Sequence, residues 1–568
     1  MLHGIGASEG IGIGTAVLVA EPDLDYSHVT PAGPEAEKAR LAAAVDTFIQ
    51  KTSALADTMR EQVGEKQAEI LSGQVMMLSD PYMQSQMSDA IDAGSCAEGA
   101  VDSVCRMYVD LFSSMDDEMM RQRASDVGDL RARLLGLLLG REAVDLSAVP
   151  AGSVLVARDF TPSMTAALRR ENVAAIVTEA GGFTSHSAIL ARTMSLPAVL
   201  SVPGVTALVK SGDTLVVDGG EGAVLQNPEP SQLKAYRARQ AELAAQRAAL
   251  EQFRGLPTRT ADGREVQLFC NIGSDRDLAA VLENTGEGVG LFRTEFLFLD
   301  RAALPTEEEQ FQVYRTVAEG LAGREVIIRT LDVGGDKDIP YLGLKQEENP
   351  FLGCRAIRYC LGHQEMFRAQ LRALLRASAF GKVRIMLPLV TRLDEVRAAR
   401  ALLEELKGEL DRSGIAYDKN IPLGVMVETP AAALIADLLA READFFSIGT
   451  NDLTQYTMAV DRGNADVAYL YSPLDPAVLR SLRAVIRAGK AAGIPVGMCG
   501  EAAADPRLIP LLLSFGLDEF SVSPAAVLST RRAIAGWTAA GADAVAERAM
   551  ALATEAEVAA LLKGISPR

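Results

Sequence analysis

The chain contains 568 residues, carries a formal net charge of −19 at pH 7, and is 48% hydrophobic. One hydrophobic core cannot organise a chain of this length, so we expect about two to four domains. The acidic balance argues against generic nucleic-acid binding, which needs a basic surface. It would steer a basic protein partner favourably, although acidity can also serve solubility alone.

Cysteine spacing and hydropathy predict a cytoplasmic protein. The six cysteines show no paired C-x-x-C spacing, and a chain of this size needs no disulfide bonds, so reduced thiols are expected. The sequence lacks the basic segment and apolar core of a secretory signal near its start, and no apolar run reaches about 18 residues. We therefore expect neither export nor membrane insertion.

The first part of the chain passes from strand to helix and back to strand. Glycine-bounded apolar residues predict a strand region at 4–20, and strand patterns return at 154–157, 175–178, 214–217 and 223–225. Between them, helical periodicity with few glycines or prolines predicts helices at 36–59, 65–78, 82–91, 97–115 and 127–139. We interpret this as one α/β domain, built from residues 1–30 and 146–228, with a helical bundle at 31–145 inserted into it.

A helical linker and a long run of alternating elements follow. The linker is predicted at 229–260 and contains an Ala- and Gln-rich helix at 231–253. In residues 261–568, apolar strand patterns alternate with helices, and the strands are expected at 267–270, 288–292, 326–329, 384–387, 424–427, 445–448, 495–498 and 519–522. Eight such units predict a (β/α)₈ TIM barrel, which places its chemistry at the C-terminal ends of its strands.

His186 lies in the segment GGFTSHSAILAR (181–192), where glycines and hydroxyl residues precede an apolar run at helical spacing. The imidazole is therefore expected at a helix N-terminus, where unpaired backbone N–H groups favour an anion beside the ring. No second His or Cys lies nearby at ligand spacing, which disfavours a metal centre. The segment is compatible both with a reactive histidine and with a capping side chain.

Basic residues follow several of the predicted barrel strands. Arg293 and Arg329 end two strands, and Lys337 and Arg462 lie in later loops. Guanidinium and ammonium groups suit a small substrate that carries both a phosphoryl group and a carboxylate. A single arginine at such a position is more often part of a structural ion pair, but the combination favours a site.

Acidic and thiol groups follow other strands of the predicted barrel. Glu428 and Asp452 are hard oxygen ligands on neighbouring strands, the donors that Mg²⁺ prefers. Cys499 ends an otherwise apolar strand, where both an acid–base thiol and a small core residue fit.

Eight segments resemble, in order and spacing, the phosphoenolpyruvate-protein phosphotransferase family, enzyme I of the bacterial sugar phosphotransferase system. They are GGFTSHSAILAR (181–192), GLFRTEFLF (290–298), RTLDVGGDK (329–337), EENPFLGCRAIR (347–358), VMVETP (425–430), FFSIGTNDLTQY (445–456), DRGN (461–464) and GMCGE (497–501). The resemblance extends over nearly the whole chain.

This resemblance implies a swivelling phosphohistidine domain and a barrel that binds phosphoenolpyruvate. His186 would take the phosphoryl group and pass it to a histidine of the phosphocarrier protein HPr, and Thr165 would orient His186. Glu428 and Asp452 would hold Mg²⁺, and Cys499 would protonate the enolate carbon to give pyruvate. The residues that would bind the substrate are Arg293, Arg329, Lys337, Asn451 and Arg462, together with Arg355, whose role is less defined.

The resemblance also implies protein partners. The inserted bundle would dock HPr, and a Met/Leu groove at Met76, Met77, Leu78 and Met83 is one candidate surface, although methionines at helical spacing also form cores. The family forms homodimers through the barrel. The apolar helix at 507–515 is a candidate interface, with ordinary barrel packing as the alternative.

Two alternative functions are weighed against this one. Pyruvate phosphate dikinase and phosphoenolpyruvate synthase share these domains but need an ATP-binding domain, for which we expect neither a phosphate loop nor spare N-terminal length here. Relatives with an added sensory or carrier domain are disfavoured in the same way. A purely regulatory phosphoenolpyruvate-binding protein is the other alternative, and the presence of His186, Glu428, Asp452 and Cys499 argues against it.

Overall fold

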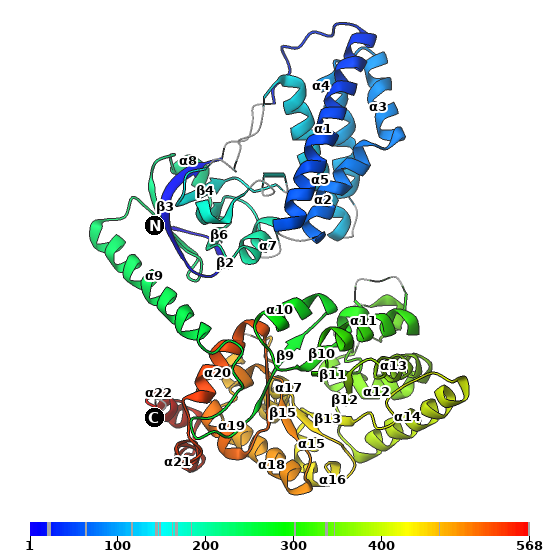
Figure 1. Ribbon diagram of the computed structural model, residues 1–568, viewed down its shortest axis with the longest axis vertical. Coiled ribbons are helices and arrows are strands. Elements are labelled where there is room, and N and C mark those ends of the chain that lie inside the picture. The colour runs from blue at the N-terminus through cyan, green and yellow to red at the C-terminus, as the bar shows by residue number, and fades with distance from the viewer. Residues whose placement is uncertain are drawn as a thin grey trace. The chain divides into compact units, whose positions relative to one another are not determined.

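The computed structural model describes residues 1–19, 24–62, 65–114, 118–141, 146, 149–161, 163–164, 168–182, 185–299, 301, 303–335, 339–345, 347–464 and 466–565. Within these ranges, the side chains at 61–62, 65–67, 118–122, 186 and 340 are not described. The chain forms two compact units, residues 1–247 and residues 248–568 (Figure 1).

An eight-stranded sheet forms the base of the first unit. In sheet order its strands are β1 (Leu2–His3), β8 (Ala223–Gln226), β7 (Thr214–Asp218), β3 (Ile11–Leu18), β4 (Ser153–Ala157), β5 (Val173–Thr178), β6 (Ala198–Leu200) and β2 (Ile5–Ser8). Strands β3 to β6 are parallel, and β7 is antiparallel to β3. Successive residues Val154 and Leu155 of β4 belong to different apolar clusters, so this strand is buried on both faces, as a continuous apolar run predicts.

The sheet joins segments from both sides of the helical insertion, as the sequence predicts. The strand region predicted at 4–20 contains both β2 and β3, whereas the sequence patterns did not resolve β1 and β6. Strand β1 has only two residues, too few for any period to show, and β6 has three. Two helices, α7 (His186–Thr193) and α8 (Val205–Leu208), also belong to this part of the unit.

The inserted bundle consists of α1 (Pro34–Gln62), α2 (Glu65–Leu78), α3 (Pro81–Asp92), α4 (Ala97–Ser113) and α5 (Glu118–Leu139), which run alongside one another (Figure 1). Its core includes Phe48, Leu78, Met83 and Met87. The core interpretation is therefore correct for Leu78 and Met83, whereas Met76 is 74% exposed. Helix α5 begins nine residues before the predicted start at 127, because its first turns carry no apolar period.

Helix α9 (Pro230–Glu251) is the predicted helix of the linker, and most of it packs on the sheet of the first unit. Its apolar residues Leu233, Tyr236 and Leu243 contact the cluster around Ile11. Gln240 Nε2 donates a hydrogen bond to the Ile11 carbonyl at 2.7 Å.

The second unit is a closed parallel barrel. Its strands are β9 (Gln267–Ile272), β10 (Val289–Arg293), β11 (Glu325–Arg329), β12 (Lys382–Leu387), β13 (Leu423–Val427), β14 (Phe446–Ile448), β15 (Val496–Met498) and β16 (Glu519–Val522), and β16 pairs with β9 to close it. All eight predicted strands are confirmed, with ends that agree within two residues. The fold class is therefore the one expected, whereas the four domain boundaries drawn from the sequence stay a prediction.

Helices surround this barrel and continue beyond its last strand. They are α10 (Leu278–Glu283), α11 (Glu307–Gly320), α12 (Ala356–Gly362), α13 (Gln364–Ala377), α14 (Leu393–Ser413), α15 (Pro430–Leu434), α16 (Ala436–Leu439), α17 (Thr450–Met458), α18 (Pro476–Ala492), α19 (Ile509–Phe515), α20 (Val527–Ala535), α21 (Ala539–Met550) and α22 (Glu555–Lys563). The apolar side chains of α19 are buried, so ordinary packing, not an exposed interface, accounts for the helix predicted at 507–515.

Candidate active site

His186 is the first residue of α7, as the sequence predicts. The preceding Ser185 caps the helix, because its hydroxyl accepts a hydrogen bond from the Ala188 N–H at 3.3 Å. The next residue, Ser187, is buried and donates to Asp159 Oδ1 at 2.7 Å, which fixes the start of the helix to the loop after β4. The His186 imidazole lies outside the described side chains, as does the whole of Thr165.

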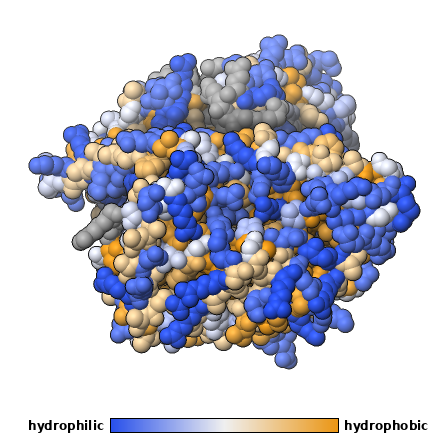
Figure 2. Space-filling view, turned by 60° about the horizontal axis from the view of Figure 1, so that its bottom comes forward, coloured by the Kyte–Doolittle hydropathy of each residue, from blue (hydrophilic) through white to orange (hydrophobic). Residues whose placement is uncertain are grey.

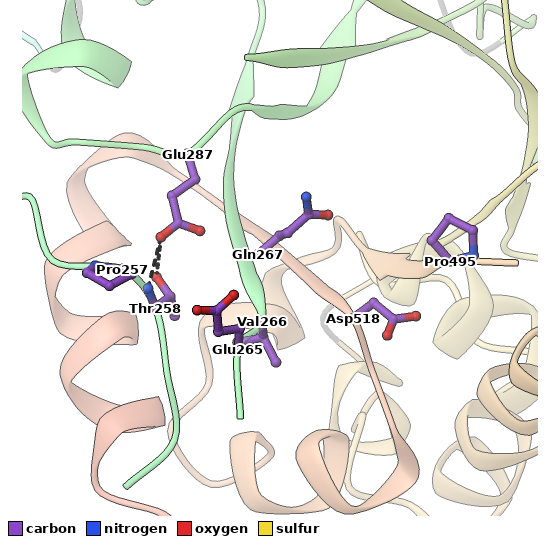
Figure 3. A pocket seen from close by; sticks show the side chains of 8 residues that line it. All are labelled: Pro257, Thr258, Glu265, Val266, Gln267, Glu287, Pro495 and Asp518. Atoms are coloured by element: carbon purple, nitrogen blue, oxygen red, sulfur yellow. Dashed lines mark hydrogen bonds between the residues drawn. The ribbon is translucent and has the colours of Figure 1, made fainter. Parts of the chain in front are cut away.

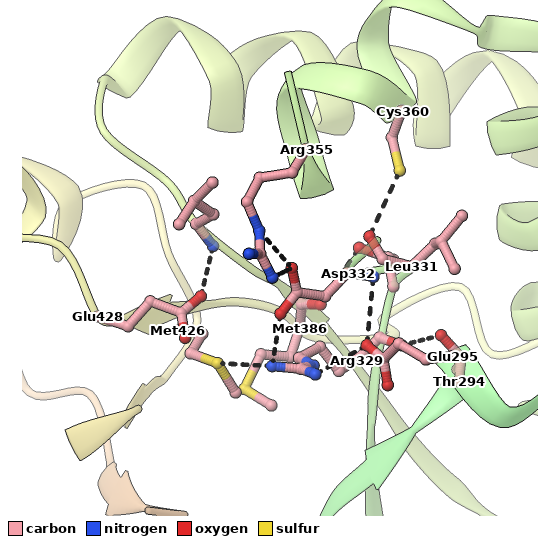
Figure 4. Close-up of polar contacts among 12 residues, drawn as sticks. Thr294, Glu295, Arg329, Leu331, Asp332, Arg355, Cys360, Met386, Met426 and Glu428 are labelled. Atoms are coloured by element: carbon pink, nitrogen blue, oxygen red, sulfur yellow. Dashed lines mark hydrogen bonds and ion pairs between the residues drawn. The ribbon is translucent and has the colours of Figure 1, made fainter. Parts of the chain in front are cut away.

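A buried cluster of charged side chains lies at the C-terminal ends of β10 and β11 (Figure 4). Arg329, the last residue of β11, contacts Glu295 Oε1 at 2.7 Å and Asp332 Oδ2 at 3.0 Å. The other oxygen of Asp332 accepts hydrogen bonds from Arg355 at 3.0 and 3.3 Å. Asp332 is thus shared between two guanidinium groups, and Arg329 between two carboxylates.

Burial and mutual attraction oppose each other in this cluster. Burial favours the neutral acid at Asp332, but Arg329 and Arg355 outweigh it and hold the pKa of Asp332 below its usual value. Burial dominates at Glu295 and raises its pKa, although Arg329 opposes the change. For Arg329, burial is outweighed by Glu295, Asp332 and Glu428, which raise the pKa of its guanidinium. The cluster therefore keeps both arginines positively charged out of bulk water.

Glu428 follows β13 and is 1% exposed. Its Oε1 accepts a hydrogen bond from the Leu389 N–H at 2.6 Å. A Cβ atom at Gly449 would stand 2.7 Å from Glu428 Oε2, so the glycine makes room for this carboxylate. Burial first, and then the negative charges of Asp452 and Asp332, raise the pKa of Glu428 well above its usual value.

Asp452 lies in the first turn of α17, directly after β14. Its Oδ1 is 3.5 Å from Arg462 Nη1. The neighbouring Asn451 accepts a hydrogen bond from the Glu501 N–H at 3.1 Å and lines a cavity of about 280 Å³ together with Thr450, Tyr471, Pro473, Glu501, Ala502 and Asp505. Residues from the loops after β14 and β15 therefore line the same cavity.

The carboxylates of Glu428 and Asp452 fit a divalent cation. Each is an oxygen donor, and their mutual repulsion is what a cation between them would relieve. Among the described residues, no three His, Cys, Asp or Glu side chains gather as a metal site. A cation here would therefore need oxygen atoms from substrate or water as well.

Cys499 follows β15 and is 4% exposed. Its sulfur lies 3.8 Å from the Ile448 carbonyl oxygen, inside an apolar cluster that includes Leu291, Met426 and Phe445. Burial raises the pKa of the thiol to about 12. The group therefore holds its proton at neutral pH, as a proton donor must.

The structure brings most of the predicted barrel residues to one end of the barrel. Arg293 ends β10 and is exposed, so it is not part of the buried cluster. Lys337 lies outside the described residues. The sequence reasoning did not assign roles to Glu295 and Asp332, which hold Arg329, although both follow predicted strand ends within the segments that were singled out.

Comparison with known proteins decides the family. Residues 247–538 match the family described as PEP-utilising enzyme, PEP-binding domain; residues 149–222 match its mobile domain and residues 3–123 its N-terminal domain. A phosphoenolpyruvate-protein phosphotransferase of Geobacillus stearothermophilus is 46% identical over 99% of this chain and 97% of its own length. The Bacillus subtilis protein of that name is 45% identical over 99% of each chain. The chain belongs to the phosphoenolpyruvate-protein phosphotransferase family.

The matched regions agree with the observed elements. The PEP-binding match spans all eight barrel strands and Cys499, and the mobile-domain match contains β4 to β7 and His186. A phosphotransferase of Staphylococcus carnosus is 44% identical over 99% of this chain and 98% of its own. No helix among the described residues is long and apolar enough to cross a membrane.

Proposed function

We propose that this phosphotransferase moves the phosphoryl group of phosphoenolpyruvate to its own His186, releasing pyruvate, and then to a histidine of the phosphocarrier protein HPr. This transfer would start the sugar phosphotransferase cascade. The single observation that carries the proposal is the similarity over the full length to phosphoenolpyruvate-protein phosphotransferases. It is supported by a barrel end that holds buried arginines, the carboxylates of Glu428 and Asp452 and one thiol.

The charged cluster supports substrate binding, because anionic groups of the substrate can replace the carboxylates that now contact its arginines. The phosphate and carboxylate of phosphoenolpyruvate are chemically similar to the carboxylates that Arg329 and Arg355 already contact, so a substrate can replace part of those contacts without uncovering a charge. Arg462 is 42% exposed at its side chain, as a group that meets an incoming ligand should be. We assign substrate binding to Arg293, Arg329, Lys337, Arg355, Asn451 and Arg462.

Glu428 and Asp452 would hold Mg²⁺, with the chemistry of the two carboxylates as the support. When bound, the cation supplies charge stabilisation for the enolate oxygen that the departing phosphoryl group leaves behind. Cys499 would then donate its proton to C3 of the enolate, because its thiol is protonated and lies at the strand end beside these carboxylates.

His186 would receive the phosphoryl group at the start of α7, where unpaired N–H groups favour an anion. Thr165 is assigned to orient the imidazole. Among the described neighbours of these two residues, Ser163 donates to Asp129 Oδ1 and Ser187 donates to Asp159 Oδ1, each at 2.7 Å.

The helical bundle is the proposed docking site for HPr. Four exposed apolar residues on its helices α2, α3 and α4 support this: Met76 and Tyr82 are 74% and 67% exposed, and Met107 and Leu111 are 45% and 48% exposed. Met107 and Leu111 are four residues apart on one helix face. The net charge of −19 would attract a basic carrier surface.

We further propose a homodimer through the barrel and a cytoplasmic location. Leu434 and Tyr469 of the barrel unit are 84% and 80% exposed, which leaves apolar surface for a partner. Elsewhere, the face in Figure 2 mixes hydrophilic and hydrophobic residues. All six cysteines, each within the described residues, are free, as expected in a reducing compartment.

The test uses phosphoenolpyruvate labelled on phosphorus, with Mg²⁺ and the full chain. Label that is acid-labile and alkali-stable, and that is lost in His186→Ala, supports the proposal. Binding of phosphoenolpyruvate without label would instead support a regulatory binding protein. Transfer of the label to HPr then tests the second step.

A further inference from the structure

Asn271, near the C-terminal end of β9, contacts the backbone of Cys499. Its Nδ2 donates hydrogen bonds to the Cys499 carbonyl oxygen at 3.0 Å and to the Ser521 carbonyl oxygen at 3.2 Å. Its Oδ1 accepts a hydrogen bond from the Ser521 hydroxyl at 2.6 Å. The side-chain amide therefore joins β9 to β16 and to the residue that follows β15.

These contacts require the amide of an asparagine. The two carbonyl oxygens can only accept hydrogen bonds, so the nitrogen of the amide must face them and the oxygen must face the Ser521 hydroxyl. An aspartate at position 271 would offer no donor to either carbonyl. Strand β10 leaves room for the fully buried Ser521, because a Cβ atom at Gly290 would stand 2.5 Å from its Oγ.

The Cys499 backbone lies beyond the last residue of β15, where strand pairing no longer fixes it. Its N–H donates to the Ile448 carbonyl at 3.1 Å, on one side, and Asn271 binds its carbonyl on the other. The next residue is Gly500, where a Cβ atom would stand 1.8 Å from Thr450 Oγ1. Glycine restricts the backbone least of all residues, so the contact with Asn271 fixes the peptide between Cys499 and Gly500.

The Cys499 sulfur depends on this backbone for its direction. It lies in an apolar cluster with Leu291, and Leu291 is directly opposite Asn271 in the register of β10 and β9. Apolar neighbours give a thiol no directional partner. Protonation of a planar enolate needs the S–H group to approach C3 from one face, and a misplacement of about 1 Å can cost about 10²-fold in rate.

Asn271 is not placed to bind a ligand from the nearby cavity. That cavity, of about 460 Å³, lies at the N-terminal ends of β9, β15 and β16, with Gln267, Pro495 and Asp518 among its lining residues (Figure 3). Asn271 is four residues beyond Gln267 in β9, which is about 13 Å along a strand. The three polar contacts of its amide are all made with protein atoms, so we look for its role in what it holds.

We propose that Asn271 is a positioning residue for the protonation of the enolate: it holds the Cys499 carbonyl and so directs the thiol at one face of C3. Ser521 holds Asn271 in turn. This inference rests on the proposed function. In that step the S–H bond breaks and the enolate electrons form the C3–H bond. The enolate oxygen becomes the carbonyl oxygen of pyruvate, and a thiolate is left. Asn271 acts through the Cys499 backbone and exchanges no proton.

The experiment follows the configuration of the new methyl group. The full chain with Mg²⁺ converts phosphoenolpyruvate that carries deuterium at one C3 position, in tritiated water, and the pyruvate is trapped at once as lactate. Wild-type protein should give one configuration. Asn271→Ala should give a mixture of both and form pyruvate about tenfold or more slowly, because the thiol no longer has one direction. The initial rate at which ³²P label enters His186 should stay near the wild-type value.

Two further variants complete the test. Ser521→Ala leaves both Nδ2 contacts but removes the donor to Oδ1, so it should cause a smaller loss in the same direction. It also guards against a folding defect of Asn271→Ala. Asn284→Ala is the matched control, because it removes an amide that donates to the Ala280 carbonyl at 2.9 Å, at the end of α10. This control should keep the wild-type rate and configuration.

The outcomes separate the inference from the proposed function. Mixed configurations in Asn271→Ala, fewer in Ser521→Ala and none in Asn284→Ala support it. A single configuration at the wild-type rate in Asn271→Ala would overturn it, as it would in Ser521→Ala if Asn271→Ala does not fold. An equal loss of His186 label and of pyruvate, with one configuration kept, would show a structural role only. Wild-type protein that forms mixed configurations, or no pyruvate, would instead refute the proposed role of Cys499 or the proposed function.

Discussion

The two ends of the barrel bury arginines in different ways. At the C-terminal end, Arg329 is 8% exposed and contacts the side-chain carboxylates of Glu295 and Asp332. At the N-terminal end, Arg531 is 1% exposed and donates its hydrogen bonds to the carbonyls of Phe253 and Thr285 and to two threonine hydroxyls, and the Glu287 carboxylate is farther away, at 3.8 Å.

The difference lies in what a ligand can replace. A phosphate or carboxylate can take the place of a carboxylate partner, because the charge and the geometry are alike. It cannot replace backbone carbonyls that are fixed in the fold. We therefore expect changes at the C-terminal end to act on the reaction, and changes at the N-terminal end to act on stability.

The largest effect is expected at the C-terminal end. Cys499→Ala removes the proposed proton donor, so pyruvate formation should fall by about 10²- to 10⁴-fold. The affinity for phosphoenolpyruvate, measured by calorimetry, should stay near the wild-type value, because the thiol is not among the charged groups. A wild-type rate in this variant would show that another group protonates the enolate.

At the opposite end, Arg531→Met should act on the fold. It leaves the Phe253 and Thr285 carbonyls without their donor, so the free energy of unfolding should fall by roughly 3 to 5 kcal/mol. Urea unfolding followed by circular dichroism measures this change. Below the melting temperature of the variant, kcat should remain unchanged. A large loss of kcat in fully folded protein would contradict the contrast between the two ends.

Glu519, in the interior nearer the N-terminal end, should make stability depend on pH. Its folded pKa of about 8 lies above the unfolded value, so its contribution is fully present below about pH 4.5 and is lost as the pH rises towards 8. Relative to Glu519→Gln, the wild-type barrel should lose roughly 2 to 4 kcal/mol between pH 5 and pH 8.5. Urea unfolding of both proteins, measured at several pH values across this range, gives the difference between their free energies of unfolding. A difference in the free energy of unfolding that does not change with pH would mean that Glu519 is ionised in the folded barrel.

The smallest effect is expected for Arg355→Lys. Lysine keeps the charge but cannot reproduce the two contacts of the guanidinium with Asp332, so KM for phosphoenolpyruvate should rise by about tenfold. Thermal unfolding serves as the control, since the buried charge is retained. An unchanged KM would place Arg355 among the structural arginines, with Arg531.

Local patterns in the sequence determined the elements of this protein. Each barrel strand is a short apolar run between polar loops, and the start of α7 at His186 follows from glycines and hydroxyl residues before an apolar period. These signals lie within a few neighbouring residues, so they can be read without the fold. Strand β6 was not found, although β14 and β15, which also have three residues, were found as members of the alternating strand and helix pattern of the barrel.

The partners of the site residues were decided by tertiary structure alone. Asp332 lies 23 residues before Arg355 in the chain, and Asn271 lies 228 residues before Cys499. Only closure of the barrel determines which side chains face inward and which charges meet there. For that reason the sequence indicated the kinds of group at the site. The fold decided which carboxylate contacts which arginine.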